Sequence, residues 1–259
     1  MPTNLFNQIV YGPVHSRRLG LSLGINLSPP DGKRCTFNCI YCECGLNEER
    51  KACHPSPSRE DVRQALSGKL AQMNVEGIVP DRITFSGNGE PTMHPAFSSI
   101  ITDTLEIRNR FCPSAKIAVL TNSTLLHKAD VVSALCRADE NLMKLDAATD
   151  ELIRLIDQPV KNDFTAAKLV EQLCSFNGKL IIQSIFLSGE YRGVRIDNTG
   201  DAAIDAWLAA LQKIRPQKVM IYTIDRETPV KSLQKIPLTA LEEIAAQVRN
   251  RYIKVDVFS

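Results

Sequence analysis

The chain has no long apolar run, no excess of charge of one sign, no internal repeat and no low-complexity stretch. Its apolar runs stay below the roughly 18 residues that a membrane span needs, so we expect no membrane partner. Its start lacks a basic segment followed by an apolar one, so we expect a cytoplasmic protein without a secretory signal. With 31 basic and 29 acidic residues, the net charge of +2 gives no reason to expect tight, non-specific binding to nucleic acid or lipid, but leaves a local basic patch open.

The composition is that of an ordinary globular protein. Of 259 residues, 44% are hydrophobic and 23% are charged, which excludes a disordered tail, a collagen and a disulfide-stapled mini-domain. A chain of this length can bury a full core without a staple. No linker rich in Gly, Pro or Ser divides it, so we expect one domain over residues 1–259.

Short β-like runs alternate with helical patterns along most of the chain. We expect strands at 21–27, 82–86, 116–121, 142–146, 179–187, 218–222 and 253–258, and helices at 58–73, 96–108, 129–137, 164–176, 201–214 and 239–249. This alternation is typical of βαβ units in an α/β fold with a parallel sheet. Six or seven such units predict a full or partial barrel with helices outside the sheet.

The expected domain has three parts. The N-terminal segment covers residues 1–20 and is expected to be irregular over 11–20. The barrel core covers 21–225, and a C-terminal helix and strand cover 226–259. In parallel α/β sheets, chemistry gathers beyond the carboxyl ends of the strands. This rule directs attention to the loop after the first core strand and to residues 86–92, which follow the second.

The cysteines are distributed unevenly. Of eight, four fall within ten residues, with Cys53 nearby: Cys35, Cys39, Cys42 and Cys44. The others, Cys112, Cys136 and Cys174, are scattered, and we expect them to be small buried hydrophobic residues. A disulfide framework would spread its cysteines, so the dense group indicates a metal or cluster site in a reducing compartment.

Three of these thiols have the spacing C-x3-C-x2-C. Thiolates at Cys35, Cys39 and Cys42 can each hold one iron of a four-iron cluster and leave the fourth iron open to a cofactor or substrate. Structural zinc is the alternative, with Cys44 or His54 as a fourth ligand, although zinc cysteines usually come in two separated pairs. Free thiols are the third interpretation, and the spacing favours the iron–sulfur cluster.

The triplet, with an aromatic residue (Tyr41) before its last cysteine, resembles the signature of the radical S-adenosylmethionine (SAM) superfamily. The segment Ser86–Thr92 is similar to the superfamily's Gly-Gly-Glu-Pro motif. The resemblance implies a partial (βα)6 TIM-like barrel, a [4Fe–4S] cluster and SAM. It also implies that SAM is cleaved reductively to a 5′-deoxyadenosyl radical, which abstracts hydrogen from an unidentified substrate.

Segments 11–20, 86–91 and 222–226 resemble, more closely, a bacterial subgroup of Fe–S oxidoreductases related to the wyosine-forming tRNA enzymes. Those enzymes carry extra cluster cysteines upstream of the triplet, whereas no cysteine precedes Cys35 here, which counts against the wyosine reaction. A radical-installing activase of a partner protein, an RNA-modifying radical enzyme and a zinc- or cluster-binding scaffold remain alternatives. A flavodoxin or ferredoxin is the expected electron donor.

The resemblance also implies roles for individual residues. Cys35, Cys39 and Cys42 would hold the cluster, whose open iron would bind the amino and carboxylate groups of SAM. Tyr41 would lie against the adenine, and the methionyl ammonium would meet Gly87, Asn88, Gly89 and Glu90. Cys44 and Cys53 leave a second cluster open.

Lys144 and Asp146 stand two apart at a strand end, on one face of that strand. We expect Lys144 to pair with the SAM carboxylate and Asp146 with the ribose, with Asn122 and Gln183 as weaker ribose candidates. A plain salt bridge at the barrel mouth is the alternative.

Three arginines belong to segments near the expected barrel mouth: Arg17, Arg18 and Arg226. Guanidinium groups gathered at one opening predict a substrate with an anionic group such as a phosphate or carboxylate. Alternatively, they brace the N-terminal segment through Asp225 or Glu227.

Overall fold

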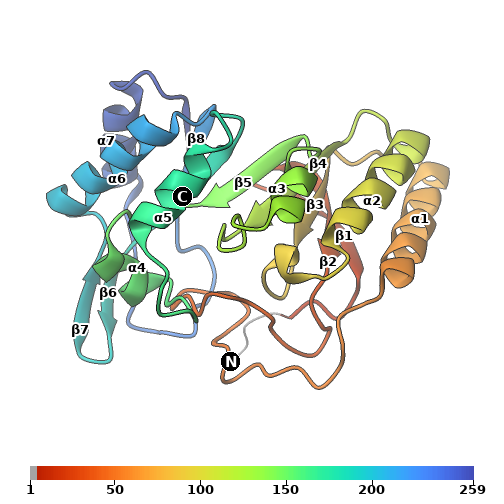
Figure 1. Ribbon diagram of the computed structural model, residues 1–259, viewed down its shortest axis with the longest axis horizontal. Coiled ribbons are helices and arrows are strands. Elements are labelled where there is room, and N and C mark those ends of the chain that lie inside the picture. Colours follow the sequence, from red (N-terminus) through yellow and green to blue (C-terminus); the bar gives the residue numbers. More distant parts are fainter. Residues whose placement is uncertain (1–4) are drawn as a thin grey trace.

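A ten-stranded sheet organises the protein in the computed structural model, which describes residues 5–259 (Figure 1). Its strands are β1 (Val10–Ser16), β2 (Gly20–Asn26), β3 (Arg82–Ser86), β4 (Lys116–Thr121), β5 (Glu140–Lys144), β6 (Ile181–Tyr191), β7 (Val194–Asp197), β8 (Lys218–Thr223), β9 (Gln234–Lys235) and β10 (Val255–Phe258). Residues 1–4, the start of the segment expected over 1–20, lie outside the described residues.

The sheet is parallel through most of its width. Its order is β1-β2-β3-β4-β5-β6-β8-β10, and each neighbouring pair from β2 to β10 runs in parallel. Strand β1 adds an antiparallel edge to β2, while β7 and β9 pair antiparallel with the extended end of β6. The order starts at β1 and ends at β10 without closing, so the expected partial barrel is confirmed.

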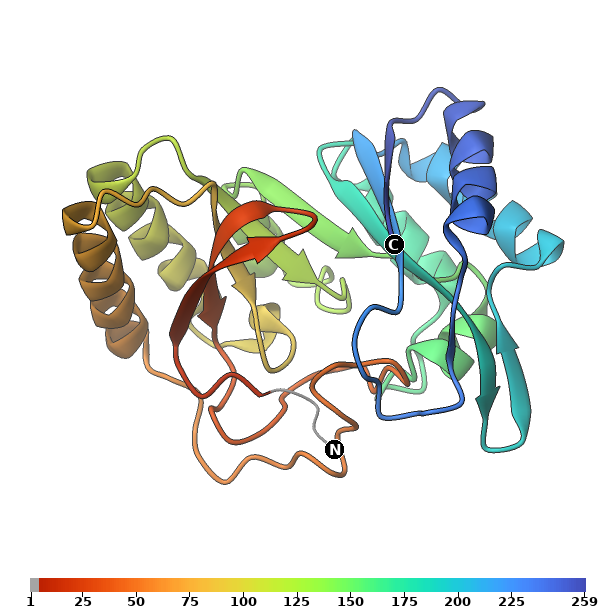
Figure 2. The ribbon, with the colours of Figure 1, turned by 180° about the vertical axis from the view of Figure 1, so that it is seen from behind.

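The helices cover the outer face of the curved sheet, and Figure 2 shows the strands from the opposite side. They are α1 (Arg59–Val75), α2 (Phe97–Phe111), α3 (Ala129–Leu135), α4 (Asp150–Ile156), α5 (Ala166–Cys174), α6 (Asp201–Ile214) and α7 (Leu238–Arg249), with a short 3-10 helix η1 at Pro91–Met93. Helix α1 begins with a capping box, in which the Ser58 hydroxyl accepts from the Asp61 amide and the Asp61 carboxylate accepts from the Ser58 amide. Among residues 5–259, no helix is long and apolar enough to cross a membrane.

Several elements differ from the sequence expectation, among them β7, β9 and η1, which were not expected. The segment expected to be irregular contains β1, a bulged edge strand whose Gly12 and Pro13 hide its alternation. Helix α4 has only seven residues and was not expected. Strand β6 runs to Tyr191 instead of ending at 187, because residues 188–191 pair with β7 in a hairpin. The division at 1–20, 21–225 and 226–259 stays a prediction.

Buried contacts fix the carboxyl ends of the central strands. Trp207 of α6 is 1% exposed, and its indole Nε1 donates to the Leu145 carbonyl and the Ser184 hydroxyl, each at 3.0 Å. Asn198 donates to the carbonyls of Asp146 at 2.9 Å and Ile185 at 2.7 Å. Satisfied buried polar groups of this kind are costly to disrupt, so the strand ends that carry the expected site are rigid.

Candidate cluster and cofactor site

The cysteine triplet lies in the loop between β2 and α1, at the end of the sheet where the parallel strands terminate (Figure 1). Cys39 is buried, and Cys35 and Cys42 are partly exposed. A two-bond bridge ties this loop to the segment after β3, because the Arg34 amide donates to the Asn88 carbonyl at 3.0 Å and the Glu90 amide donates to the Arg34 carbonyl at 2.9 Å. The two sequence motifs are therefore joined directly.

The glycines of the second motif are required by close packing in and beside this bridge. Gly87 has φ +115°, and a Cβ there would lie 2.6 Å from Asn26 Oδ1. Gly89 has φ +153°, and a Cβ there would lie 1.9 Å from the Arg34 carbonyl oxygen. Their lack of a side chain thus serves the packing of this chain against itself, which is a reason that the sequence alone did not supply.

Asn88 stabilises the same junction. Its side chain is fully buried and donates to the carbonyls of Phe6 at 2.8 Å and Pro29 at 3.0 Å, while its Oδ1 accepts from the Phe6 amide at 2.7 Å. The Asn88 backbone carbonyl is bonded to Arg34. Asn88, expected to contact SAM, therefore has its side chain occupied in holding the N-terminal segment against the motif.

The Glu90 carboxylate is 3% exposed and is held by its neighbours. Its Oε1 accepts from the Thr92 amide at 3.1 Å, the Thr92 hydroxyl at 2.5 Å and the Thr121 hydroxyl at 2.7 Å. Its Oε2 accepts from the Asn122 amide at 2.6 Å, and a carboxylate oxygen has room for a second donor. Burial raises the pKa of Glu90 despite these hydrogen bonds, which favour the ionised form.

Asn122 joins this carboxylate to the cysteine loop. Its Nδ2 donates to the Thr36 hydroxyl at 2.8 Å and lies 3.5 Å from the Cys35 sulfur. Asn122 therefore lies beside the triplet, as expected of a residue of the site. Its side-chain amide nitrogen, however, is already hydrogen-bonded to Thr36.

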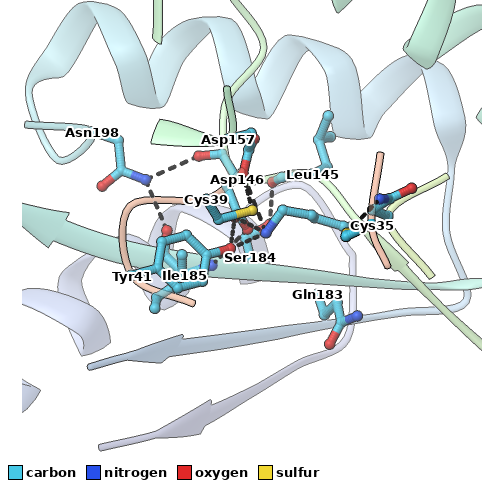
Figure 3. A network of polar contacts seen from close by, with 12 residues as sticks. Cys35, Cys39, Tyr41, Leu145, Asp146, Asp157, Gln183, Ser184, Ile185 and Asn198 are labelled. Atoms are coloured by element: carbon cyan, nitrogen blue, oxygen red, sulfur yellow. Dashed lines mark hydrogen bonds and ion pairs between the residues drawn. The ribbon is translucent and has the colours of Figure 1, made fainter. Parts of the chain in front are cut away.

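A buried network brings three of the expected SAM residues together (Figure 3). The Tyr41 hydroxyl is hydrogen-bonded to Asp146 and to the Lys144 ammonium. Lys144 forms ion pairs with Asp146 and, at 3.2 Å, with Asp157. The Lys144 ammonium is also 4.6 Å from the centre of the Tyr41 ring. The salt-bridge alternative for Lys144 and Asp146 is therefore present, and it includes the aromatic residue of the cysteine motif.

Asp157 is the member of this network that sequence reasoning missed. It follows the unexpected helix α4, is 2% exposed and accepts from the Cys39 thiol at 3.5 Å. Burial raises the pKa of Asp157 to about 7. Burial acts to lower the pKa of Lys144, but the charges of Asp146 and Asp157 raise it well above the ordinary lysine value. No local pattern around Asp157 marks it, because its partners come from distant segments.

The three thiols of the triplet differ in electrostatic surroundings. Burial raises the pKa of Cys35 to about 11 and that of Cys39 well above its usual range. A hydrogen bond with Cys44 instead lowers the pKa of Cys42 below the usual thiol value. Metal binding requires thiolates, so protonated thiols of the triplet would lose their protons on binding, and Cys42 is the most easily deprotonated of the three.

Gln183 lies on β6 and contacts one of the arginines expected at the mouth. Its Oε1 accepts from Arg18 at 3.1 Å, its Nε2 donates to the Leu142 carbonyl at 3.2 Å, and the Arg18 guanidinium lies 4.4 Å from the centre of the Tyr222 ring.

The other two arginines are engaged by exposed acidic groups. Arg17 pairs with Asp225 at 2.8 Å and donates to the Ser259 carbonyl at 2.6 Å. Arg226 pairs at 2.8 Å with Glu43 of the cysteine loop. The contact that the bracing interpretation requires is thus present for Arg17, and Arg226 connects the segment after β8 with the cysteine loop.

The donor set fits an iron–sulfur cluster. Its three thiols come from one loop, and although burial acts to lower the pKa of Lys33, the charges of these thiols raise it. A four-iron cluster takes one thiolate per iron, so its ligands need not converge on one ion. In the part of the chain that the structure describes, no three His, Cys, Asp or Glu side chains are placed to share a single metal ion. An open cleft of about 570 Å³ reaches Cys35 and Lys33.

Comparison with known proteins places the chain in a family. No family model matches it. It is 30% identical over 230 residues to a UPF0026 protein of Helicobacter pylori, covering 86% of this chain and 68% of that protein. It is 31% identical over 237 residues to a UPF0026 protein of Synechocystis, covering 87% and 78%. The GTPase Obg of Brachyspira hyodysenteriae is 33% identical over 223 residues, but this chain spans only 30% of that protein.

Solved structures show the same fold. A radical SAM methyltransferase from Sphaerobacter thermophilus matches with a TM-score of 0.68 at 15% identity, covering 92% of this chain and 65% of that one. TYW1 with a lysine-pyruvate adduct bound matches with a TM-score of 0.61 at 16% identity, covering 88% and 73%. With the joined motifs and the open parallel barrel, these matches confirm the resemblance stated from the sequence, and the chain belongs to the UPF0026 family and has the radical SAM fold.

Proposed function

We propose that this protein is a radical SAM enzyme that abstracts hydrogen from a substrate still to be identified. The observation that carries the proposal is the bridge of Arg34 to Asn88 and Glu90, which joins the cysteine loop to the motif that resembles a SAM-binding segment. When bound, a [4Fe–4S] cluster supplies the electron that cleaves SAM to methionine and a 5′-deoxyadenosyl radical. The chain supplies ligands, orientation and exclusion of water.

Cys35, Cys39 and Cys42 hold the cluster in this proposal. Asp157 accepts from the Cys39 thiol, so its carboxylate is a nearby acceptor for the proton that Cys39 would release on ligation. Asn122 beside Cys35 fixes the first ligand against the Glu90 segment. These contacts restrict the ligands before iron arrives, which lowers the ordering cost of binding.

SAM lies between this loop and the strand ends. Glu90 Oε2, with one donor in place, would accept from the methionyl ammonium, and the backbone of Gly87 and Gly89 would line the same position. Tyr41 contacts the adenine with its ring held by Lys144 and Asp146. Because Lys144 is already paired with two carboxylates, we assign it chiefly to orienting Tyr41.

Asp146, Asn122 and Gln183 remain the ribose candidates, while Asn88 contributes through its backbone. An anionic substrate group at Arg17, Arg18 or Arg226 remains a prediction. Such a group would have to displace Asp225 from Arg17 or Glu43 from Arg226. A flavodoxin or ferredoxin as electron donor and a cytoplasmic location are likewise part of the proposal.

Anaerobic reconstitution tests the cluster. The protein should bind about four irons and four sulfides, in keeping with a single cubane. Cys39→Ala should lose them, whereas the matched control Cys174→Ala on α5 should retain them, because that cysteine lies outside the loop. An iron content near eight that depends on Cys44 and Cys53 would contradict the single-cluster assignment.

A further inference from the structure

Lys33 is a buried cation without a carboxylate partner among the described residues. It stands two positions before Cys35, is 7% exposed and donates from Nζ to the Gly45 carbonyl at 2.8 Å. None of the ion pairs of residues 5–259 includes Lys33. A buried ammonium that lacks a counter-ion costs several kcal/mol, so its position needs an explanation.

Lys33 lies beside the loop that carries the triplet. It lines the same cleft as Cys35. The carbonyl that its Nζ contacts belongs to Gly45, whose amide donates to the Cys42 carbonyl at 2.9 Å. Lys144, the other buried lysine near the loop, differs, because it is neutralised by Asp146 and Asp157. Lys33 is therefore a buried cation of the ligand loop whose charge no carboxylate of the described residues offsets.

The backbone holds Lys33 in this place. Its amide donates to the Arg50 carbonyl at 2.7 Å, and the next residue, Arg34, is fixed in the bridge to Gly89. The ammonium is tied to the far side of the same loop at Gly45. Lys33 thus spans the loop that carries the ligands, and its ammonium cannot move away from that loop without breaking the tie to Gly45.

We propose that Lys33 is a positioning residue that compensates the negative charge of the cluster and its three thiolates and thereby raises the cluster's reduction potential. The inference rests on the proposed function, since it needs a cluster at the triplet. Adding one electron adds one negative charge to a buried group, and a fixed cation nearby stabilises the reduced form over the oxidised form. Hydrogen bonds to the sulfurs act in the same direction.

A redox titration of the reconstituted protein, followed by the signal of the reduced cluster, tests the inference. Lys33→Gln keeps a donor for the Gly45 carbonyl and removes the charge. Its reduction equilibrium should move at least tenfold toward the oxidised form, which is about 59 mV for one electron. Lys33→Arg should stay within a few-fold of wild type, and so should the control Lys213→Gln on an exposed position of α6.

Each outcome of this experiment supports or overturns either the inference or the proposed function. Wild-type protein that binds no iron overturns the proposed function itself, whereas Lys33→Gln with full iron and an unchanged potential overturns only the inference. If Lys33→Gln folds without retaining the cluster and Lys33→Arg retains it, charge compensation is supported. If both fold and both lose the cluster, or if Lys33→Gln and Lys33→Met fail to fold even without iron, the lysine serves the chain's own structure and the inference is wrong.

Discussion

Gly89 and Arg34 are partners in a parallel bridge, and a Cβ on Gly89 would lie 1.9 Å from the Arg34 carbonyl oxygen. This contact is the point at which the cysteine loop meets the end of β3. Because the contact joins backbone to backbone, it fixes the distance between the two motifs. A single methyl group added at Gly89 should therefore displace the whole cluster loop.

Gly89→Ala should destabilise the protein by about 2–4 kcal/mol, from backbone strain and the clash with Arg34. It should also lower the iron content after reconstitution. The control is Gly68→Ala inside α1, where an added Cβ meets nothing within 4 Å. That change should stabilise the protein by about 0.5–1 kcal/mol. Urea unfolding and iron assays of both variants give the comparison, and wild-type stability in Gly89→Ala would contradict the bridge.

Glu90→Gln should weaken SAM binding, because the methionyl ammonium loses a charge-assisted partner worth roughly 1.5–3 kcal/mol. The carboxylate also holds Thr121 and Asn122, so stability must be measured beside affinity. Thr121→Val removes one donor to Glu90 and keeps the negative charge, so SAM affinity should stay within a few-fold of wild type. Equilibrium dialysis with labelled SAM separates the two, and equal affinities for all three proteins would remove Glu90 from the site.

Glu140 ties the amino ends of β3 and β4 to β5, far from the cysteine loop in the direction of the strands. Its carboxylate is 2.6 Å from Arg82 Nε and 3.0 Å from Lys116 Nζ. Burial acts to raise the pKa of Glu140, but hydrogen bonds from Arg82 and Lys116 outweigh it and the pKa is lowered.

The stabilisation from Glu140 should accordingly be full above the ordinary glutamate pKa of about 4.3 and be lost as the pH falls through its lower folded value. Glu140→Gln should cost roughly 1–3 kcal/mol at pH 7 and progressively less in acid. Urea unfolding of both proteins from pH 7 to pH 3 measures the difference. A difference that stays constant over that range is the opposing result.

Arg17→Ala tests the ion pair with Asp225. Both side chains are substantially exposed, at 46% and 39%, so the pair should contribute less than about 1 kcal/mol. We expect a small drop in melting temperature with cluster content and substrate-free SAM cleavage near wild type. A large loss of iron in this variant would show that the Arg17–Asp225 pair controls the cluster loop, which the exposure of the pair does not suggest.

The strongest local patterns predicted their elements correctly. The strands at 82–86 and 116–121 and the helix at 201–214 are found at the expected bounds, because apolar runs or a clear helical period end at turn residues. The antiparallel strand β1 was missed, since its Gly12 and Pro13 interrupt the alternation. Its existence depends on pairing with β2.

The candidate site was likewise predictable only in part. The motif residues could be found because their spacing is local, and the structure joins Tyr41 to Lys144 and Asp146 as part of one network. Asp157 and Lys33 could not be found, because a single aspartate after a short helix or a lysine before a cysteine becomes significant only through burial and distant partners. The side-chain bonds of Asn88 to Phe6 were invisible for that reason as well.

The most direct test of the central claim is the reductive cleavage of SAM by the anaerobically reconstituted protein without added substrate. With a strong reductant, we predict slow release of 5′-deoxyadenosine and methionine, measured by liquid chromatography, with none from Cys39→Ala and a normal amount from Cys174→Ala. Iron-loaded wild-type protein that binds SAM and releases no 5′-deoxyadenosine with any reductant would contradict the assignment as a radical SAM enzyme.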